Sequence, residues 1–259
     1  MNETVLYEAH AGVATITLNR PERLNSMTTE LLDGALEALE MAADDRGVRA
    51  VIFTGAGRAF CAGADLNAKN ILGTGNFESQ NRNLRMYVRT AQLLREMPKP
   101  TIAAVNGAAA GAGAAWSFAA DLRYAAESAK FLTAYVNVGL SGDFGGTWTL
   151  PKIVGAAKAR EMFLLNTPVS AVEAERLGIV SKVFPNESFM DEVRAIAERL
   201  ANSAPTAVRN IKANLNDADR ISFSEALDRD SERHLRAGQS PDAAEARSAF
   251  LEKRAPVFK

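Results

Sequence analysis

Short apolar runs rich in β-branched residues alternate with longer amphipathic runs along the first half of the chain. The apolar runs predict strands at residues 13–18, 48–54, 101–105 and 121–125. Residues 28–43 and 87–97 instead carry apolar side chains at helical spacing, and Pro98 ends the second of these helices. Strands that alternate with helices in this way predict an α/β fold.

One uncharged stretch, residues 101–120, is long enough to cross a bilayer. Ten of its residues are alanine and three are glycine, so its transfer into lipid would gain little free energy. We therefore expect a strand, a glycine turn and a buried helix in this stretch, and no membrane span.

The strand pattern ends near residue 202, and the rest of the chain is helical in pattern with charge on most turns. Ser240, Pro241 and Asp242 form a strong helix start, because serine is a good N-cap and proline fits the first turn. We predict a core of residues 1–201 and a helical region of residues 202–259 that packs on this core or on a neighbouring subunit.

The charges of the chain are balanced, with 30 lysines and arginines against 31 aspartates and glutamates. No global positive field draws such a chain to nucleic acid or to an anionic membrane, so an anionic ligand needs a local site. One cysteine and two histidines exclude a disulfide framework and disfavour a Cys/His metal site. The first 20 residues lack the basic and apolar regions of a secretory signal, and we therefore expect a cytoplasmic protein.

Three glycine-rich segments are candidate ligand-binding turns: residues 55–63, 106–113 and 139–146. Gly111 and Gly113 are followed by Trp116 where a dinucleotide-binding turn has its third glycine, and no segment has the lysine of a P-loop. Backbone N–H groups at such turns can approach a ligand oxygen closely, and a helix dipole favours negative charge there. Two facing turns of this kind would form an oxyanion hole.

Four motifs carry a resemblance that covers nearly the whole chain. They read FCAGADL from residue 60, AVNGAAAGAG from 104, SAKF from 128 and GLSGDFGGTWTLPKIVG from 139. Together they are similar to the crotonase superfamily of acyl-CoA enzymes, also called the enoyl-CoA hydratase/isomerase family. The resemblance implies a crotonase (ClpP/crotonase-like) spiral of ββα units, with a C-terminal helical region for trimerisation. It also implies homotrimers or hexamers built from two trimers.

The resemblance implies an acyl-CoA thioester as the substrate and an oxyanion hole formed by the backbone N–H groups of Ala62 and Ala112. These donors would stabilise the charge that develops on the thioester oxygen when the neighbouring C–H is deprotonated. It implies no metal, and no cofactor beyond the coenzyme A that is part of the substrate.

The chain departs from the hydratases of this family at two positions. Those hydratases carry two glutamates that hold the attacking water, and the matching residues here are Ala115 and Tyr135. The nearby carboxylate is Asp143, eight residues after Tyr135. This arrangement resembles the single-carboxylate isomerases, above all the ring-1,2-epoxyphenylacetyl-CoA isomerases of phenylacetate breakdown. The favoured hypothesis is an isomerase in which Asp143 moves a proton between two carbons of the enolate.

Other interpretations of Asp143 stay open. Aspartate is also common in turns and as the N-cap of a helix, here one beginning near Thr147. A water ordered by Asp143 would support hydration of a 2-enoyl-CoA, and direct attack by Asp143 would make the protein a dehalogenase or hydrolase. A crotonase fold without turnover would be a scaffold.

The resemblance places coenzyme A binding on the first loop, the loop around the hole and the last helix, on residues Arg23, Leu24, Ala64, Asp65, Leu66, Phe250 and Lys253. Phe250 and Lys253 match positions where a helix, sometimes from the adjacent subunit, touches adenine and phosphate. Tyr135 is interpreted as a packing aromatic residue or a substrate contact. Asp65 is expected at an exposed loop position, and the polar residues 67–85 are expected to cover the site.

Overall fold

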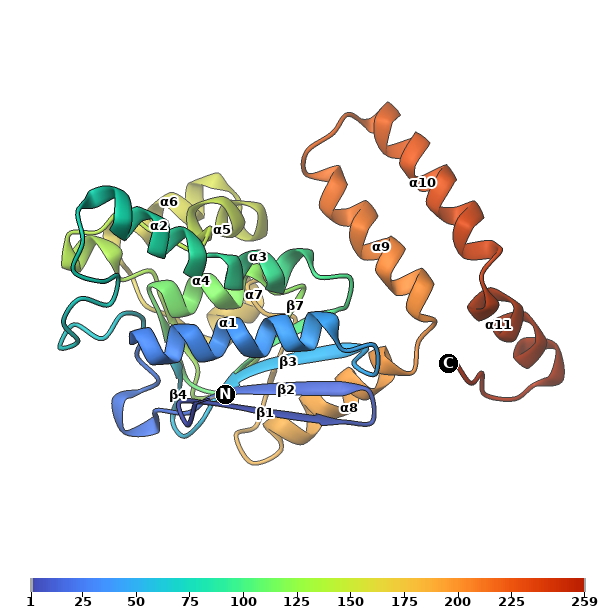
Figure 1. Cartoon of the computed structure of the whole chain (residues 1–259), viewed down its shortest axis with the longest axis horizontal. Coiled ribbons are helices and arrows are strands. Elements are labelled where there is room, and N and C mark those ends of the chain that lie inside the picture. Colours follow the sequence, from blue (N-terminus) through green and yellow to red (C-terminus); the bar gives the residue numbers. More distant parts are fainter. Residues whose placement is uncertain (1, 259) are drawn as a thin grey trace.

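The computed structural model describes residues 2–258 and contains two β-sheets surrounded by helices (Figure 1). The larger sheet has the strand order β1-β2-β3-β5-β7-β10, in which β1 is antiparallel to β2 and the other neighbours are parallel. Its strands are β1 (Val5–His10), β2 (Val13–Leu18), β3 (Ala50–Gly55), β5 (Thr101–Val105), β7 (Leu122–Ala126) and β10 (Lys182–Phe184). The smaller sheet has the order β4-β6-β8-β9, with strands β4 (Ala59–Cys61), β6 (Ala108–Ala110), β8 (Lys130–Leu132) and β9 (Val169–Ser170).

Helices connect these strands and continue beyond the last one. In the described chain they are η1 (Pro21–Arg23), α1 (Thr29–Asp44), α2 (Phe77–Tyr87), α3 (Arg89–Glu96), α4 (Ala112–Ala119), η2 (Tyr135–Val138), α5 (Gly146–Val154), α6 (Ala156–Leu165), α7 (Ala171–Arg176), α8 (Phe189–Ala201), α9 (Pro205–Ala218), α10 (Phe223–Gly238) and α11 (Pro241–Glu252). Of the helices between residues 2 and 258, none is long and apolar enough to cross a membrane.

The predicted α/β core is confirmed. The four predicted strands are β2, β3, β5 and β7, and both β2 and β5 begin and end at the predicted residues. The two predicted helices are α1 and α3. The prediction missed β1 and β10 of the larger sheet and all strands of the smaller sheet. The strands of the smaller sheet have only two or three residues, too few to display an alternating pattern.

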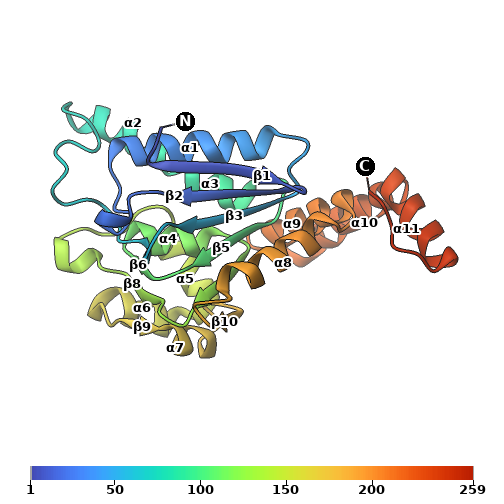
Figure 2. The same ribbon diagram turned by 90° about the horizontal axis from the view of Figure 1, so that it is seen from below.

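The larger sheet separates two apolar cores. Along β3, Val51 and Phe53 pack into the core beneath α1, whereas Ala50 and Ile52 pack on the side of α8. This alternation follows from the two-residue period of a strand. Figure 2 shows α1 on one side of the sheet and α8 on the other. Because both faces are covered, β3 is buried along its whole length.

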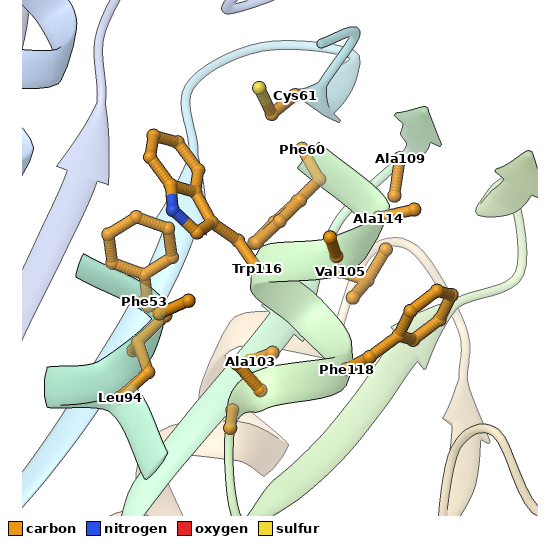
Figure 3. Packing of buried hydrophobic residues seen from close by; sticks show 14 of the residues in the cluster. Phe53, Phe60, Cys61, Leu94, Ala103, Val105, Ala109, Ala114, Trp116 and Phe118 are labelled. Carbon is orange, nitrogen blue, oxygen red and sulfur yellow. The ribbon is translucent and has the colours of Figure 1, made fainter. Parts of the chain in front are cut away.

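The uncharged stretch at residues 101–120 forms β5, β6 and the buried helix α4, as predicted apart from the extra short strand. Trp116 anchors α4 in the core, with its ring 5.4 Å from that of Phe53 in an edge-to-face arrangement. Its indole N–H donates a 2.6 Å hydrogen bond to the hydroxyl of Thr90 on α3. Figure 3 shows Trp116 and Phe53 on one side of α4 and Phe118 on the other. The contacts of Trp116 with Phe53 and Thr90 therefore fix the position of α4 in the core.

Helices α9 to α11 extend from one end of the core (Figure 1). As predicted, Ser240 caps α11 by accepting a hydrogen bond from the N–H of Ala243. Lys212 on α9 is buried, and its ammonium pairs with Asp121 at 2.7 Å. The same group donates to the carbonyl oxygens of Leu94 at 3.3 Å and Lys99 at 2.9 Å. Lys212 therefore anchors the helical region to the core, while the boundary at residues 201 and 202 stays a prediction.

Replacing Lys212 with methionine removes a buried cation and leaves the carboxylate of Asp121 with its hydrogen bonds from Thr101 but without its ion-pair partner. We expect Lys212→Met to lower the free energy of unfolding by about 3 kcal/mol, measured by chemical denaturation. Lys130→Met, at an exposed position of β8, is the matched control and should change it by less than about 0.5 kcal/mol. Equal effects of the two variants would contradict the anchoring role of Lys212.

Candidate active site

Two glycine turns meet at one edge of the smaller sheet. β4 and β6 are parallel neighbours, so the turns that follow them, at Ala62–Gly63 and at Gly111, lie at the same edge. Gly63 has a φ of +86°, and a Cβ atom built on it would lie only 2.9 Å from the carbonyl oxygen of Ala110. The two turns therefore pack backbone against backbone, and the oxyanion hole between them stays a prediction.

Gly113, in the first turn of α4, makes this approach possible. A Cβ atom at this position would lie 2.3 Å from the carbonyl oxygen of Cys61, at the end of β4. Real Cβ atoms do not come this close to backbone oxygen. The absence of a side chain at position 113 thus sets the distance between the start of α4 and the end of β4.

The two predicted hole donors differ in their hydrogen bonding. Ala112 is the first residue of α4, and its N–H has no acceptor among residues 2–258. It is one of the free donors at a helix start, where the helix dipole favours negative charge. The N–H of Ala62, in contrast, donates to the carbonyl oxygen of Leu24 at 3.0 Å. A thioester oxygen can use this second donor only by sharing it with the Leu24 carbonyl or displacing that carbonyl.

A pocket of about 90 Å³ joins the hole to the predicted carboxylate. Its lining residues are Ala62, Gly63, Ala64, Leu66, Gly111, Ala112, Ala134, Tyr135, Val138, Leu140 and Asp143. Hollows of about 220, 380 and 520 Å³ elsewhere on the molecule are larger, but no predicted catalytic residue lines them. Among the lining residues of the small pocket, Tyr135 and Asp143 carry the titratable side chains. The remaining lining atoms are apolar side chains and backbone.

Tyr135 and Asp143 form a hydrogen-bonded pair. The Tyr135 hydroxyl donates to Oδ1 of Asp143 at 2.7 Å. Burial raises the pKa of the Asp143 carboxyl, and the Tyr135 O–H and the backbone N–H of Asp143 offset only part of this rise. Burial, and then the charge of Asp143, also raise the pKa of the Tyr135 hydroxyl. The pocket therefore contains a carboxylate more basic than an ordinary aspartate and a phenol that stays protonated.

Asp143 is not a helix cap. Helix α5 begins at Gly146, and its N-cap is Gly145, without a side-chain hydrogen bond. Phe144, which lies between Asp143 and the N-cap Gly145, has a φ of +47°, which is strained for a bulky residue. Its buried ring packs edge-to-face on Trp116, with ring centroids 5.5 Å apart. The core thus holds the loop in the conformation that places Asp143 against the pocket, and the N-cap interpretation of Asp143 was wrong.

Comparisons with known proteins show which family the chain belongs to. A protein-family model described as Enoyl-CoA hydratase/isomerase matches residues 8–259. The chain belongs to the enoyl-CoA hydratase/isomerase family.

Relatives in this family include both isomerases and hydratases. The chain is similar to the 1,2-epoxyphenylacetyl-CoA isomerase of Escherichia coli (strain K12), with 40% identity over 100% of this chain and 99% of that one. It is 33% identical to the crotonyl-CoA hydratase of Syntrophomonas wolfei, over 99% of this chain and 98% of that one. The crystal structure of an enoyl-CoA hydratase from Bacillus anthracis has a TM-score of 0.92 and 32% identity, covering 99% of each chain. The predicted crotonase fold with a helical C-terminal region is therefore confirmed.

The two positions at which this family member departs from the hydratases differ in their surroundings. Ala115 is 1% exposed and does not line the pocket. A Cβ atom on Gly146 would lie 3.1 Å from the Cβ of Ala115, so the start of α5 packs directly on this position. Tyr135, in contrast, reaches the pocket and the carboxylate. Tyr135 is therefore both a packing residue and a partner of Asp143, a hydrogen bond that the sequence analysis did not predict.

The predicted coenzyme A residues near the hole lie together, with one correction. Ala64 and Leu66 line the pocket, Leu24 contacts Ala62 through its carbonyl group, and Arg23 is exposed on the neighbouring 3-10 helix η1. The expectation that Asp65 is exposed was wrong, because its carboxylate is buried and pairs with a residue that the sequence analysis had missed.

That residue is Arg20, whose two terminal nitrogens both lie 3.2 Å from Oδ2 of Asp65. Arg20 also donates to the carbonyl oxygen of Ser26 at 2.6 Å. Burial opposes ionisation of Asp65, but the N–H of Asn67 and the guanidinium of Arg20 outweigh it and lower the pKa of this carboxyl. The pair ties the first loop to the loop that follows the hole. The sequence signal was the arginine at the end of β2, in the same NRPERLN segment as Arg23.

The remaining predicted residues lie away from the pocket or in a partly helical segment. Phe250 is 82% exposed, and it lies with Lys253 at the end of α11, at the opposite end of the molecule from α2 and α6 (Figures 1 and 2). The described chain therefore does not bring Phe250 and Lys253 to its own pocket. The stretch at 67–85 is partly helical, because α2 begins at Phe77 and Asn76 caps it.

The close approach at Gly113 is testable with a single methyl group. We expect Gly113→Ala to lower the free energy of unfolding by about 1 to 3 kcal/mol, because the new Cβ must push the Cys61 carbonyl away. Gly238→Ala is the matched control, since a Cβ atom there meets nothing within 4 Å. Chemical denaturation compares the two variants, and an unchanged stability of Gly113→Ala would show that the two segments are not in tight contact.

Proposed function

We propose that the protein is an acyl-CoA isomerase that shifts a double bond, or rearranges a ring epoxide, through a thioester enolate. The observation that carries this proposal is the composition of the pocket. Asp143 is the one carboxylate among the pocket-lining residues, all of which lie in the described chain, and alanine occupies position 115. One carboxylate suffices to remove a proton and return it, whereas the hydratases described by the resemblance hold water between two glutamates.

The oxyanion hole stabilises the charge of the enolate in this proposal. The free N–H of Ala112 lies in the same pocket as Asp143. The N–H of Ala62 becomes available if the substrate oxygen displaces the Leu24 carbonyl or shares this donor with it. A thioester oxygen placed between them would gain negative charge as the proton leaves C2. Removing one such donor from an oxyanion hole typically costs about 3 to 4 kcal/mol of barrier.

Asp143 carries the proton in both steps. For a 3-enoyl-CoA, the ionised carboxylate takes a proton from C2, and the electron pair of the C–H bond delocalises onto the thioester oxygen. The neutral carboxyl then gives the same proton to C4, which restores the thioester carbonyl and leaves the double bond between C2 and C3. A general base works best when its pKa is close to the working pH, and the burial of Asp143 moves its pKa in that direction.

Hydration is the second candidate function, favoured by relatives named as hydratases. It requires a water positioned by Asp143 alone, because neither Ala115 nor the protonated Tyr135 can serve as a second base. The isomerase relative extends the favoured proposal to 1,2-epoxyphenylacetyl-CoA as a substrate to test.

Coenzyme A, as the carrier of the acyl group, is proposed to be the sole cofactor-like component. Ala64 and Leu66 line the pocket, and Arg23 is exposed on η1, directly before Leu24, whose carbonyl accepts from the Ala62 N–H. Phe250 and Lys253 would contribute only from a neighbouring subunit, because they lie far from the pocket of their own chain. The helical region supports assembly into a trimer or hexamer, since it exposes large apolar side chains: Phe223, Leu227, Leu235, Phe250 and Leu251.

The test is to incubate the wild type and Asp143→Asn separately with a 3-enoyl-CoA and a 2-enoyl-CoA and to separate the products by chromatography. We expect the wild type to convert the 3-enoyl into the 2-enoyl thioester, and Asp143→Asn to lose at least about a hundredfold in kcat. Asp33→Asn is the matched control, because Asp33 also accepts a tyrosine hydroxyl, from Tyr87 at 3.0 Å, but does not line the pocket.

Two results would overturn the proposal. One is a 3-hydroxyacyl-CoA as the main product of the wild type with the 2-enoyl-CoA, which would assign hydration. The other is full isomerase activity of Asp143→Asn, which would remove Asp143 from the reaction.

A further inference from the structure

The hydrogen bond between Tyr135 and Asp143 gives the pocket a property beyond the proposed reaction. We propose that Tyr135 is a positioning residue that occupies Oδ1 of Asp143 and leaves Oδ2 as the oxygen that moves the proton. The inference rests on the proposed function, in which Asp143 is the base. It differs from the interpretation of Tyr135 as a substrate contact, because here the tyrosine acts through the carboxylate.

Tyr135 is held firmly on three sides. Its side chain is buried, and its ring stacks on that of Phe163 with centroids 6.2 Å apart and an interplanar angle of 19°. Its backbone N–H donates to the carbonyl oxygen of Thr133 at 2.7 Å, and its carbonyl oxygen accepts from the backbone N–H of Leu140 at 3.0 Å. These contacts restrict the position of the phenol oxygen. The 2.7 Å hydrogen bond from this oxygen in turn restricts the position of the Asp143 carboxylate.

In the hydrogen bond between Tyr135 and Asp143, the tyrosine is always the donor. Burial keeps the phenol protonated, so Tyr135 donates and Asp143 accepts. Among residues 2–258, the Cys61 thiol on β4 also acts on the Tyr135 hydroxyl, and burial raises the pKa of this thiol to about 12, which keeps it neutral. No other residue between positions 2 and 258 donates to Oδ2 of Asp143. Oδ2 thus receives no hydrogen bond from another residue of this part of the chain, whereas Tyr135 holds Oδ1.

This arrangement suits a proton shuttle in particular. Burial alone would make Asp143 a strong base that holds the proton it has taken. A hydrogen bond to the charged form of a carboxyl favours ionisation, so the Tyr135 bond strengthens when Asp143 gives its proton back. Tyr135 therefore supports the second half of the reaction, the return of the proton to carbon.

The test uses Tyr135→Phe, which keeps the stacked ring and removes only the hydroxyl. Tyr87→Phe is the matched control, since it deletes the comparable 3.0 Å bond to Asp33 outside the pocket. The measurements are kcat, KM and the pH dependence of kcat/KM with a 3-enoyl-CoA, together with the thermal midpoint of each variant. A ¹³C NMR titration of aspartate-labelled protein, assigned with Asp143→Asn, follows the carboxyl directly without turnover.

We expect Tyr135→Phe to lower kcat by about tenfold or more with KM nearly unchanged, the loss typical of one hydrogen bond to a charged group. Asp143 must be ionised to act, and losing the donor favours its neutral form. The acid limb of kcat/KM and the NMR titration of Asp143 should therefore both move to higher pH. Tyr87→Phe should leave all of these quantities unchanged.

Contrary results separate the alternatives. A raised KM with unchanged kcat and an unmoved acid limb would make Tyr135 a substrate contact. Unchanged kinetics with a lowered thermal midpoint would make it a packing residue alone. Either result with an inactive Asp143→Asn would overturn only this inference, whereas an active Asp143→Asn would overturn the proposed function itself.

Discussion

Direct backbone contact between the end of β4 and the start of α4 is the constraint on which the site depends. Gly113 against Cys61 and Gly63 against Ala110 leave no space for a side chain between the two segments. Only in this arrangement can the N–H groups of both turns lie along one small pocket. The aromatic cluster around Trp116 also holds the loop of Asp143 in place, because the ring of Phe144 in that loop packs on Trp116.

The second determinant of the proposed chemistry is the electrostatic balance at Asp143. Burial in an apolar pocket raises its basicity, and one phenol hydroxyl opposes that effect. The first loop adds a competing interaction, because the carbonyl of Leu24 already accepts from the Ala62 donor. The Arg20–Asp65 ion pair connects this first loop to the loop that follows Ala62 and Gly63.

The local sequence pattern was enough to predict much of the fold and part of the candidate site. The strands β2 and β5 were predicted to the residue because each is a clear apolar run flanked by breakers. The predicted hole residues and Asp143 came from motifs that resemble those of the family, and their roles stay predictions. The three-residue strand β4, in contrast, offered no periodic pattern.

The errors concern partners that lie far apart in the sequence. Asp65 was expected to be exposed because its pair, Arg20, precedes it by 45 residues and no local rule connects the two. The bond between Tyr135 and Asp143 depends on the turn at η2 and on the stacking against Phe163, and neither can be derived from an eight-residue spacing. Phe250 and Lys253 lie at the end of α11, away from the pocket of their own chain, and the local sequence pattern does not determine where that helix packs.

The most direct test of the central claim is to follow the proton itself. A 3-enoyl-CoA carrying deuterium at C2 would be converted by the enzyme in ordinary water, and the position of the label in the product would be read by mass spectrometry and NMR. A neutral carboxyl holds one exchangeable hydrogen, so a buried single-carboxylate shuttle predicts that part of the label appears at C4 of the 2-enoyl product. A product with no label at C4, even in a single turnover, would contradict the account.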